Sequence, residues 1–268
     1  MIEFENQPII LCAQQKSGTT VLQKAFNDTD HCLNFGEVFH EKIYDVPTNE
    51  VAYFNFKRFV VKDNPELSTP HMKNQNRLFK MYFENLSNLS NKPFFLMDIK
   101  YNSWHHFNPV WHSAMEIPRL LRMVKENNIP IIHIKRKNLL HQYLISFIDN
   151  GSEDFFLKPS SEKQIYNEII INPHHCKQMI QIVKRNMDNF QNWLANYPNH
   201  HVVYYEDILI DDHFTDSINN IVAEVTNRKV TKLCDPLIKK NLENPFKYIK
   251  NRDQLINSLK NSAFEVYL

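Results

Sequence analysis

The stretch QPIILCAQQKSGTTVLQKAFND (residues 7–28) decides the fold that the sequence predicts. Its apolar first part, with Pro8 near the start, indicates a short buried strand. A basic, hydroxyl-rich turn containing Gly18 follows, and after it apolar residues recur at helical spacing. Because a turn between a strand and a helix directs backbone N–H groups and the helix N-terminus toward one point, this stretch predicts an anion-binding site.

Four further apolar runs predict strands, and helical patterns separate or follow them. The strands are expected at 31–35, 93–101, 129–136 and 200–208, and the helices at 118–127, 137–150 and 177–197. This alternation predicts an α/β fold with a central parallel sheet flanked by helices. Residues 41–92 are polar, aromatic and without a clear strand. We interpret them as an insertion over the C-terminal edge of the sheet, within a single domain of residues 1–268.

The overall charge excludes a general electrostatic attraction to nucleic acid or to an anionic membrane. The chain has 31 basic and 30 acidic residues, a net charge of +1. The N-terminus lacks the basic region of a signal peptide, and no apolar run is long enough to predict a transmembrane segment. The four cysteines form no C-x-x-C pair, which is typical of a reducing compartment. We therefore expect a cytoplasmic protein.

Glycine is scarce, which gives each glycine positional meaning. The chain has three, Gly18, Gly36 and Gly151. In so glycine-poor a chain, each is expected where a side chain cannot be tolerated. Gly18 follows the first predicted strand and Gly36 the second, so we expect these two in one active site.

The turn at Gly18 differs from the usual nucleoside-triphosphate loop, G-x-x-x-x-G-K-[ST]. If Gly18 is aligned with the second glycine, Ala13 occupies the first and Thr19 the position of the lysine. The lysine instead precedes the glycine, at Lys16. This counts against an ATPase or kinase, and a P-loop kinase that uses ATP and Mg²⁺ remains the alternative enzyme.

Two segments together resemble one family. KSGTT (16–20) resembles the 5′-phosphosulfate loop of sulfotransferases that use 3′-phosphoadenosine 5′-phosphosulfate (PAPS). IIHIKRKNLLHQYLIS (131–146) resembles the family's second signature, a strand ending in arginine and a helix carrying a serine, which hold the 3′-phosphate. Similarity to the bacterial, carbohydrate-type branch extends to DIKYNSW (98–104), VVYYEDIL (202–209) and the C-terminal NRDQLINSLKNSAFEVYL (251–268). The resemblance implies a P-loop NTPase-like sulfotransferase fold.

The resemblance also implies the donor and the residues that bind it. PAPS would be the co-substrate, and no metal would be needed. Lys16 would stabilise the leaving phosphate, and Gly18 would let the backbone approach closely. The implied cofactor-binding residues are Lys16, Ser17, Gly18, Thr19, Thr20, Arg136 and Ser146. The spacing from Arg136 to Ser146 is slightly longer than in the family, which leaves Ile145 as an alternative position.

The acceptor of the sulfuryl group must lose a proton. In the carbohydrate-acting branch a glutamate after the second strand is the proposed base, which assigns this role to Glu37, with His40 as the alternative. Lys100, at the end of the third strand, is a further catalytic candidate. The resemblance implies a hydroxyl acceptor, a carbohydrate or glycolipid. A non-catalytic nucleotide-binding relative is the alternative from another class.

The thirteen histidines do not predict a metal site. His105-His106, His174-His175 and His200-His201 are adjacent pairs, and neighbours on a strand point to opposite faces. None has the spacing of H-E-x-x-H.

Overall fold

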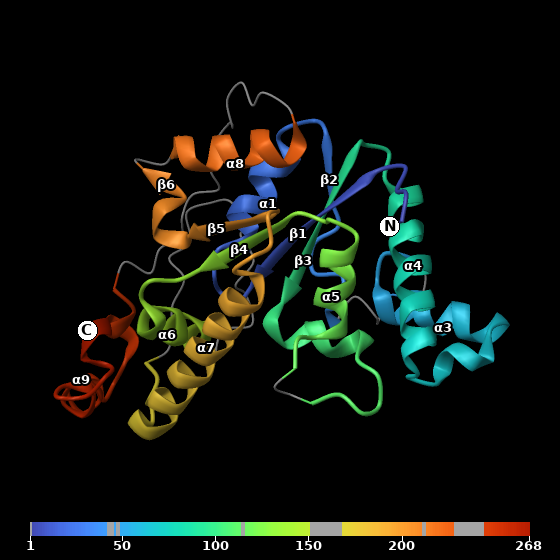
Figure 1. Cartoon of the computed structure of the whole chain (residues 1–268). Helices are drawn as coiled ribbons and strands as arrows, with labels where there is room; N and C mark the ends of the chain where they lie inside the picture. Colours follow the sequence, from blue (N-terminus) through green and yellow to red (C-terminus); the bar gives the residue numbers. More distant parts are fainter. Residues whose placement is uncertain are drawn as a thin grey trace.

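A five-stranded, all-parallel sheet lies at the centre of the protein (Figure 1). The computed structural model describes residues 2–41, 46, 49–113, 116–150, 168–210, 213–227 and 244–268. In the sheet the strands follow the order β2-β3-β1-β4-β5. They are β1 (Gln7–Ala13), β2 (Cys32–Asn34), β3 (Phe94–Lys100), β4 (Ile131–Lys135) and β5 (His200–Tyr204). The α/β class and all five predicted strands are confirmed, but the fifth strand, predicted to extend to residue 208, ends at Tyr204, and residues 205–207 form a 3-10 turn.

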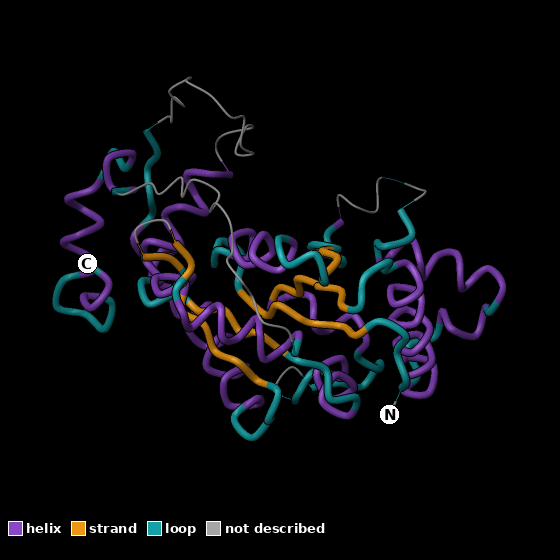
Figure 2. The backbone as a smooth tube through the Cα atoms, turned by 90° about the horizontal axis from the view of Figure 1, so that it is seen from above, coloured by secondary structure: helices purple, strands orange, loops and turns teal. Residues whose placement is uncertain are grey.

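Helices cover both faces of this sheet (Figures 1 and 2). The helices are α1 (Thr19–Asn27), α3 (Tyr53–Asp63), α4 (Met72–Leu89), α5 (Arg119–Glu126), α6 (Leu139–Asn150), α7 (Pro173–Leu194), α8 (Asp216–Thr226) and α9 (Arg252–Leu259). Short 3-10 turns are η1 (Pro65–Ser68), η2 (Tyr101–Phe107), η3 (Tyr205–Asp207), η4 (Pro245–Tyr248) and η5 (Glu265–Tyr267). A small antiparallel pair, β6 (Leu209–Ile210) and β7 (His213–Phe214), precedes α8.

Alternating side chains of β1 build two separate cores. Ile9 and Leu11 pack on the face covered by α1 and α8, whereas Ile10 and Cys12 pack on the face covered by α4, α5 and the end of α7. Successive residues of a strand point to opposite faces, so a strand covered on both sides must be apolar at every position. This explains the continuous apolar run in β1.

The segment expected as an insertion contributes to the main core. Within 41–92 the chain forms α3 and α4, and α4 buries Leu78, Phe79, Tyr82, Phe83 and Leu86. These positions recur three and four residues apart, the spacing of one helix face. Helix α4 leads directly into β3, so this part of the segment connects two strands and covers one face of the sheet.

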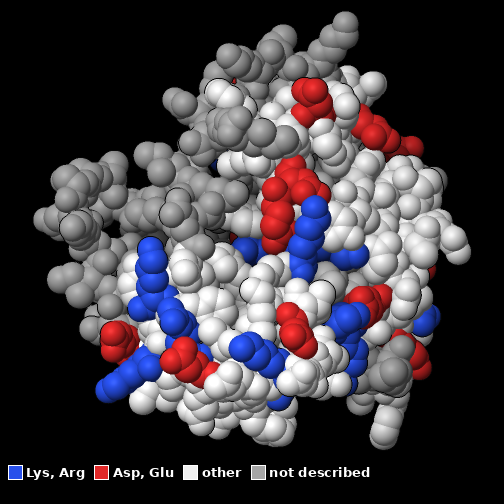
Figure 3. All heavy atoms as spheres, turned by 90° about the vertical axis from the view of Figure 1, so that its left-hand side faces the viewer, with Lys and Arg blue, Asp and Glu red and all other residues white. Residues whose placement is uncertain are grey.

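Both signs of charge are mixed on the surface. Figure 3 shows basic and acidic side chains interspersed on the face that it presents, in keeping with the net charge of +1. Among the described helices, none combines the length and hydropathy that a membrane span needs. Gly151 lies outside the described residues.

Candidate functional site

The loop between β1 and α1 lies at the carboxyl edge of the central strand. In the register of the sheet, Ala13 at the end of β1 pairs with Lys100 of β3 on one side and with Ile134 of β4 on the other. Residues that end β3 or follow β4 are therefore placed beside this loop. In open α/β sheets, ligands bind at this edge, where the chain reverses its direction of strand addition.

The loop backbone is shaped for an anion. Lys16 and Gly18 have positive φ angles of 61° and 82°, and Gly18 is the N-cap of α1. In the described structure no side chain caps this helix and its first turn holds no acidic residue. The first N–H groups of a helix lack partners within the helix; in α1 the N–H of Val21 donates to the carbonyl of Gly18 at 3.1 Å, which leaves those of Thr19 and Thr20 available to a ligand.

Gly18 is also required by its surroundings. A Cβ atom built on Gly18 would overlap Cδ2 and Cε2 of Tyr205, which follows β5. Gly36 has a φ of +68°, but a Cβ there would meet nothing within 4 Å. Gly18 is thus needed for both conformation and space, and Gly36 for conformation alone.

Lys100 connects the loop to the neighbouring strands. Its ammonium lies 2.8 Å from Thr19 Oγ1, 2.6 Å from Asp98 Oδ2 and 3.1 Å from Glu37 Oε1. Asp98 also accepts a hydrogen bond from Gln23, at 2.9 Å. Burial raises the pKa of Asp98, and the adjacent Lys100 opposes this shift. One buried cation therefore holds two carboxylates and a hydroxyl beside the loop.

Lys16 belongs to the same electrostatic cluster. Burial lowers the pKa of its ammonium, Glu37 opposes this shift, and the charge of Lys100 adds to it. The chain therefore places two lysines and an acidic side chain close enough to influence one another, and this is the set of groups predicted to stabilise and deprotonate the reactants.

Arg136 directly follows β4, on the side of β1 opposite to Lys100 of β3, and contacts the loop from there. Its guanidinium donates to the carbonyl of Lys16 at 3.3 Å, contacts His141 Nδ1 at 2.9 Å, and lies 4.0 Å from the ring centroid of Tyr205. Its Nε is 3.3 Å from Glu206 Oε1, an ion pair that lacks the geometry of a hydrogen bond. Burial lowers the pKa of Arg136, whereas Tyr205 and Glu206 raise it.

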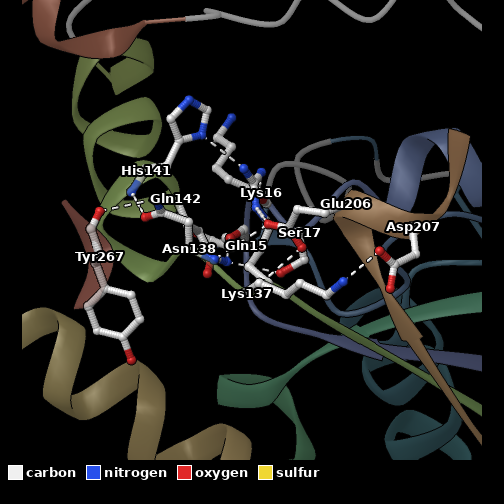
Figure 4. Close-up of polar contacts among 11 residues, drawn as sticks. Gln15, Lys16, Ser17, Lys137, Asn138, His141, Gln142, Glu206, Asp207 and Tyr267 are labelled. Atoms are coloured by element: carbon white, nitrogen blue, oxygen red, sulfur yellow. Dashed lines mark hydrogen bonds and ion pairs between the residues drawn. The ribbon is translucent and has the colours of Figure 1, made fainter. Parts of the chain in front are cut away.

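Helix α6 fixes the loop through a residue that the sequence analysis missed. Gln142 donates to the carbonyl of Gln15 at 2.7 Å and to Ser17 Oγ at 2.9 Å, and Figure 4 shows these groups together. Ser146 lies one turn further along α6 and is half-buried; no hydrogen bond joins it to the loop in the described structure. The structure therefore supports a role for α6 at this site through Gln142.

A cavity of about 280 Å³ opens next to the lysine cluster. Glu37, His40 and Lys100, three of the predicted catalytic residues, line it. The other lining residues are Gln15, Phe39, Glu41, Phe54, Asp98, Asn102, Ser103, His105 and His106. His106 stacks on Phe39, with ring centroids 5.3 Å apart. Burial, together with the nearby charges of His105 and Lys57, lowers the pKa of His106 to about 4, so its imidazole is neutral at pH 7.

A second, more apolar cavity of about 540 Å³ adjoins the first. Glu41 and Phe54 line both cavities, and Lys57, Arg58, Val61 and Ser68 complete the second. A ligand in the first cavity thus has an apolar neighbourhood next to it.

The structure brings most of the predicted site residues together. Ser17 and Thr19 are buried in the loop, whereas Thr20 is exposed at the start of α1. Sequence reasoning missed Asp98, Tyr205, Glu206 and Gln142. For Asp98 a signal existed, because it precedes Lys100 by two residues on a strand and so shares its face. Within the described ranges, no three histidine, cysteine or acidic side chains are grouped to hold a metal ion.

Neither the models of known protein families nor the sequences of curated proteins match this chain.

A buried tyrosine–histidine pair anchors the end of β3. Tyr101, next to Lys100, places its hydroxyl 2.6 Å from Nε2 of His133 in β4. His133 is fully buried. Burial, aided by His200 and Lys135, lowers the pKa of His133 to about 3.

We therefore expect the protein to lose stability as the pH falls from 6.5 toward 4. In this range an unfolded histidine binds a proton and folded His133 does not, so the unfolded state gains stability by about 3 kcal/mol. Urea denaturation at several pH values should show a shallower pH dependence for His133→Gln, which keeps a polar group for Tyr101. Equal slopes in the two proteins would contradict the assignment of a neutral His133.

Proposed function

We propose that this chain is a P-loop-like sulfotransferase that moves a sulfuryl group from PAPS to a hydroxyl of a carbohydrate or glycolipid. The observation that carries the proposal is the 3.3 Å contact between Arg136 and the carbonyl of Lys16. A nucleotide with phosphates at the 3′ and 5′ positions needs two anion sites close together. A guanidinium beside a loop with available helix N–H groups supplies both.

The donor side of the site fits a doubly anionic ligand. Lys16, Ser17, Gly18 and the first residues of α1 would hold the 5′-phosphosulfate, and Arg136 the 3′-phosphate. Arg136 is 5% exposed, and its Nε already forms an ion pair with Glu206 at 3.3 Å. Each of its terminal nitrogens carries two N–H groups and makes one polar contact within the described structure, which leaves N–H groups for an anionic ligand.

Lys100 supplies the charge that the loop sequence lacks. Thr19 occupies the usual position of the P-loop lysine, and the ammonium of Lys100 lies 2.8 Å from its hydroxyl. The lysine of a P-loop reaches the reacting phosphates, and Lys100 would do so from β3. Two ammonium groups, of Lys16 and Lys100, would then face the negative charge that develops during transfer.

Transfer forms an S–O bond to the acceptor and breaks the bond between sulfur and the 5′-phosphate oxygen. The acceptor hydroxyl gives its proton to Glu37, and the nucleoside 3′,5′-bisphosphate leaves with the electron pair of the broken bond. Glu37 contacts Lys100 through Oε1 and lines the cavity, which supports its assignment as the base. His40 lines the same cavity and is the alternative base.

The cavities support a sugar-containing acceptor. Phe39, Phe54 and the neutral ring of His106 offer flat apolar surfaces, while Asn102 and Ser103 offer hydrogen-bonding groups. This combination suits a sugar, which has apolar faces and polar edges. In the adjoining cavity Phe54 and Val61 offer apolar surface for a lipid part of the acceptor.

The proposal is tested by binding and transfer with the full chain. We expect adenosine 3′,5′-bisphosphate to raise the melting temperature, and labelled sulfuryl transfer from PAPS to at least one member of a glycan and glycolipid panel. Stabilisation by ATP and Mg²⁺ alone would instead identify a kinase. Binding of the bisphosphate without transfer to any acceptor would identify a non-catalytic relative.

Two variants are expected to separate chemistry from binding. Lys16→Ala should lower kcat by about 10²–10³-fold, because it removes a charge that acts mainly in the transition state. Arg136→Ala should mainly weaken bisphosphate affinity, measured by calorimetry. Lys137→Ala is the matched control, since this exposed side chain pairs with Asp207 on the surface. Wild-type turnover in both site variants would refute the site assignment.

A further inference from the structure

Turn η3 contacts both anion-binding parts of the candidate site. The ring of Tyr205 lies against Gly18, so closely that no Cβ fits there, and the same ring lies 4.0 Å from the guanidinium carbon of Arg136. One side chain therefore packs against both the loop and the arginine, which also contact each other through the carbonyl of Lys16. A shift of this ring would change the position of both.

Glu206, the next residue, holds Arg136 from another direction. Its Oε1 is 3.3 Å from Arg136 Nε, and its Oε2 accepts the backbone N–H of Lys137 at 3.0 Å. The carboxylate thus links the arginine to the chain just before α6. Because a backbone N–H fixes the carboxylate, the carboxylate can fix the long, otherwise mobile arginine side chain.

The remaining contacts of Arg136 lead back to the loop. One terminal nitrogen donates to the carbonyl of Lys16, and the other contacts His141 on α6. The guanidinium is thus held by groups from the loop, from η3 and from α6. Its orientation depends on the conformation of the loop, and the loop in turn depends on the ring of Tyr205.

We propose that Tyr205 and Glu206 are positioning residues that set the distance between the 5′-phosphate loop and Arg136, and so make the site selective for nucleotides with a 3′-phosphate. This inference rests on the proposed function. A fixed spacing between two anion sites raises the affinity for a ligand that fills both sites, but not for a ligand that fills one. The side chains that fix the spacing therefore determine the selectivity without touching the nucleotide.

The test compares the affinities of the protein for two nucleotides, one with and one without a 3′-phosphate. Adenosine 3′,5′-bisphosphate and adenosine 5′-monophosphate are titrated into the full chain by calorimetry, and the ratio of their dissociation constants is compared between variants. We expect Tyr205→Leu to lower the preference for the bisphosphate about tenfold, a typical size for a coupled cation–π contact. Glu206→Gln, a milder change, should lower it several-fold and covers the case in which Tyr205→Leu does not fold.

Two controls separate positioning from general damage. Tyr205→Phe keeps the ring and should keep the wild-type preference. Tyr204→Leu removes the adjacent tyrosine, whose ring faces Lys135 and Lys137 at 5.3 and 5.4 Å, and should also leave the preference unchanged.

The outcomes distinguish this inference from the proposed function. If the wild-type protein prefers the bisphosphate and both Tyr205→Leu and Glu206→Gln keep this preference, the inference is overturned but the proposed function stands. Equal weakening of both nucleotides overturns it too, because it shows a merely structural role. If the wild-type protein itself prefers neither nucleotide, the proposed function fails and the inference with it.

Discussion

Replacing Gly18 with alanine is expected to destabilise the protein by several kcal/mol and to abolish nucleotide binding. A φ of +82° costs an alanine about 1–2 kcal/mol. The new methyl group also overlaps the ring of Tyr205, and overpacking of this kind costs about 1–3 kcal/mol more. The ring also lies 4.0 Å from the guanidinium carbon of Arg136, so a displaced ring is expected to disturb the arginine that we propose binds the 3′-phosphate. Urea denaturation measures the first effect and calorimetry with adenosine 3′,5′-bisphosphate the second.

Gly36 offers a matched control for this prediction. Its φ of +68° imposes the same conformational penalty, but a Cβ there meets no atom within 4 Å. Gly36→Ala should therefore cost about 1 kcal/mol, and Gly18→Ala should cost no more than this in a Tyr205→Ala background, where the overlap is absent. If the two glycine variants lose the same free energy of unfolding in the wild-type background, the overlap with Tyr205 does not contribute to the destabilisation.

Replacing Lys100 with methionine is expected to have the second large effect. Methionine fills a similar volume but leaves Asp98, whose side chain is fully buried, without its ion-pair partner. Removing one member of a buried pair costs about 3–5 kcal/mol. Turnover should fall by about 10²–10³-fold, since the charge opposite the developing anion is lost. Denaturation and transfer assays measure the two effects.

The pH dependence of this variant identifies the cause. Burial already raises the pKa of Asp98, and removing Lys100 removes the opposing influence. A carboxyl group with a raised pKa in the folded state binds its proton more readily there than in the unfolded state, so the loss of stability of the variant relative to the wild-type protein should become smaller as the pH falls from 7. Asp98→Asn should rescue the stability of Lys100→Met, but not its activity.

Lys135→Met serves as the control for this loss. Lys135 ends β4 as Lys100 ends β3, and it is also largely buried, but its ammonium contacts the amide oxygen of Gln191 at 3.2 Å. In the described structure, its replacement leaves no buried carboxylate without an ion-pair partner. A loss of stability as large as that of Lys100→Met would contradict the explanation based on Asp98.

The strands could be predicted because strands buried on both faces have apolar residues at consecutive positions. In β1 and β4 nearly every position faces one of two cores, so the apolar runs themselves mark the strands. The start of α7 was less accurate: the helix begins at Pro173 instead of 177, because Asn172 caps it by accepting the N–H groups of His174 and His175. Helices α3 and α4 went unpredicted; on α4, asparagine and lysine on the exposed face dominate the local composition.

The candidate site was predictable where its residues follow strands and unpredictable where they meet across the fold. Lys16, Lys100 and Arg136 are each placed at the same edge of the sheet by strand order, and an approximate sheet suffices to group them. The contacts of Tyr205 with Gly18 and of Gln142 with Ser17 depend on how η3 and α6 pack against the loop. No local pattern encodes such packing.

The two sides of the site have different origins in the chain. The loop, Arg136 and Lys100 belong to the inner strands β1, β3 and β4, whereas the cavity wall also draws on residues 37–41 after the short edge strand β2, on Phe54, and on η2. Substitutions in this peripheral wall leave the middle of the sheet untouched. Under the proposed function, substitutions in this wall would change the acceptor while leaving unaltered the residues proposed to bind the donor.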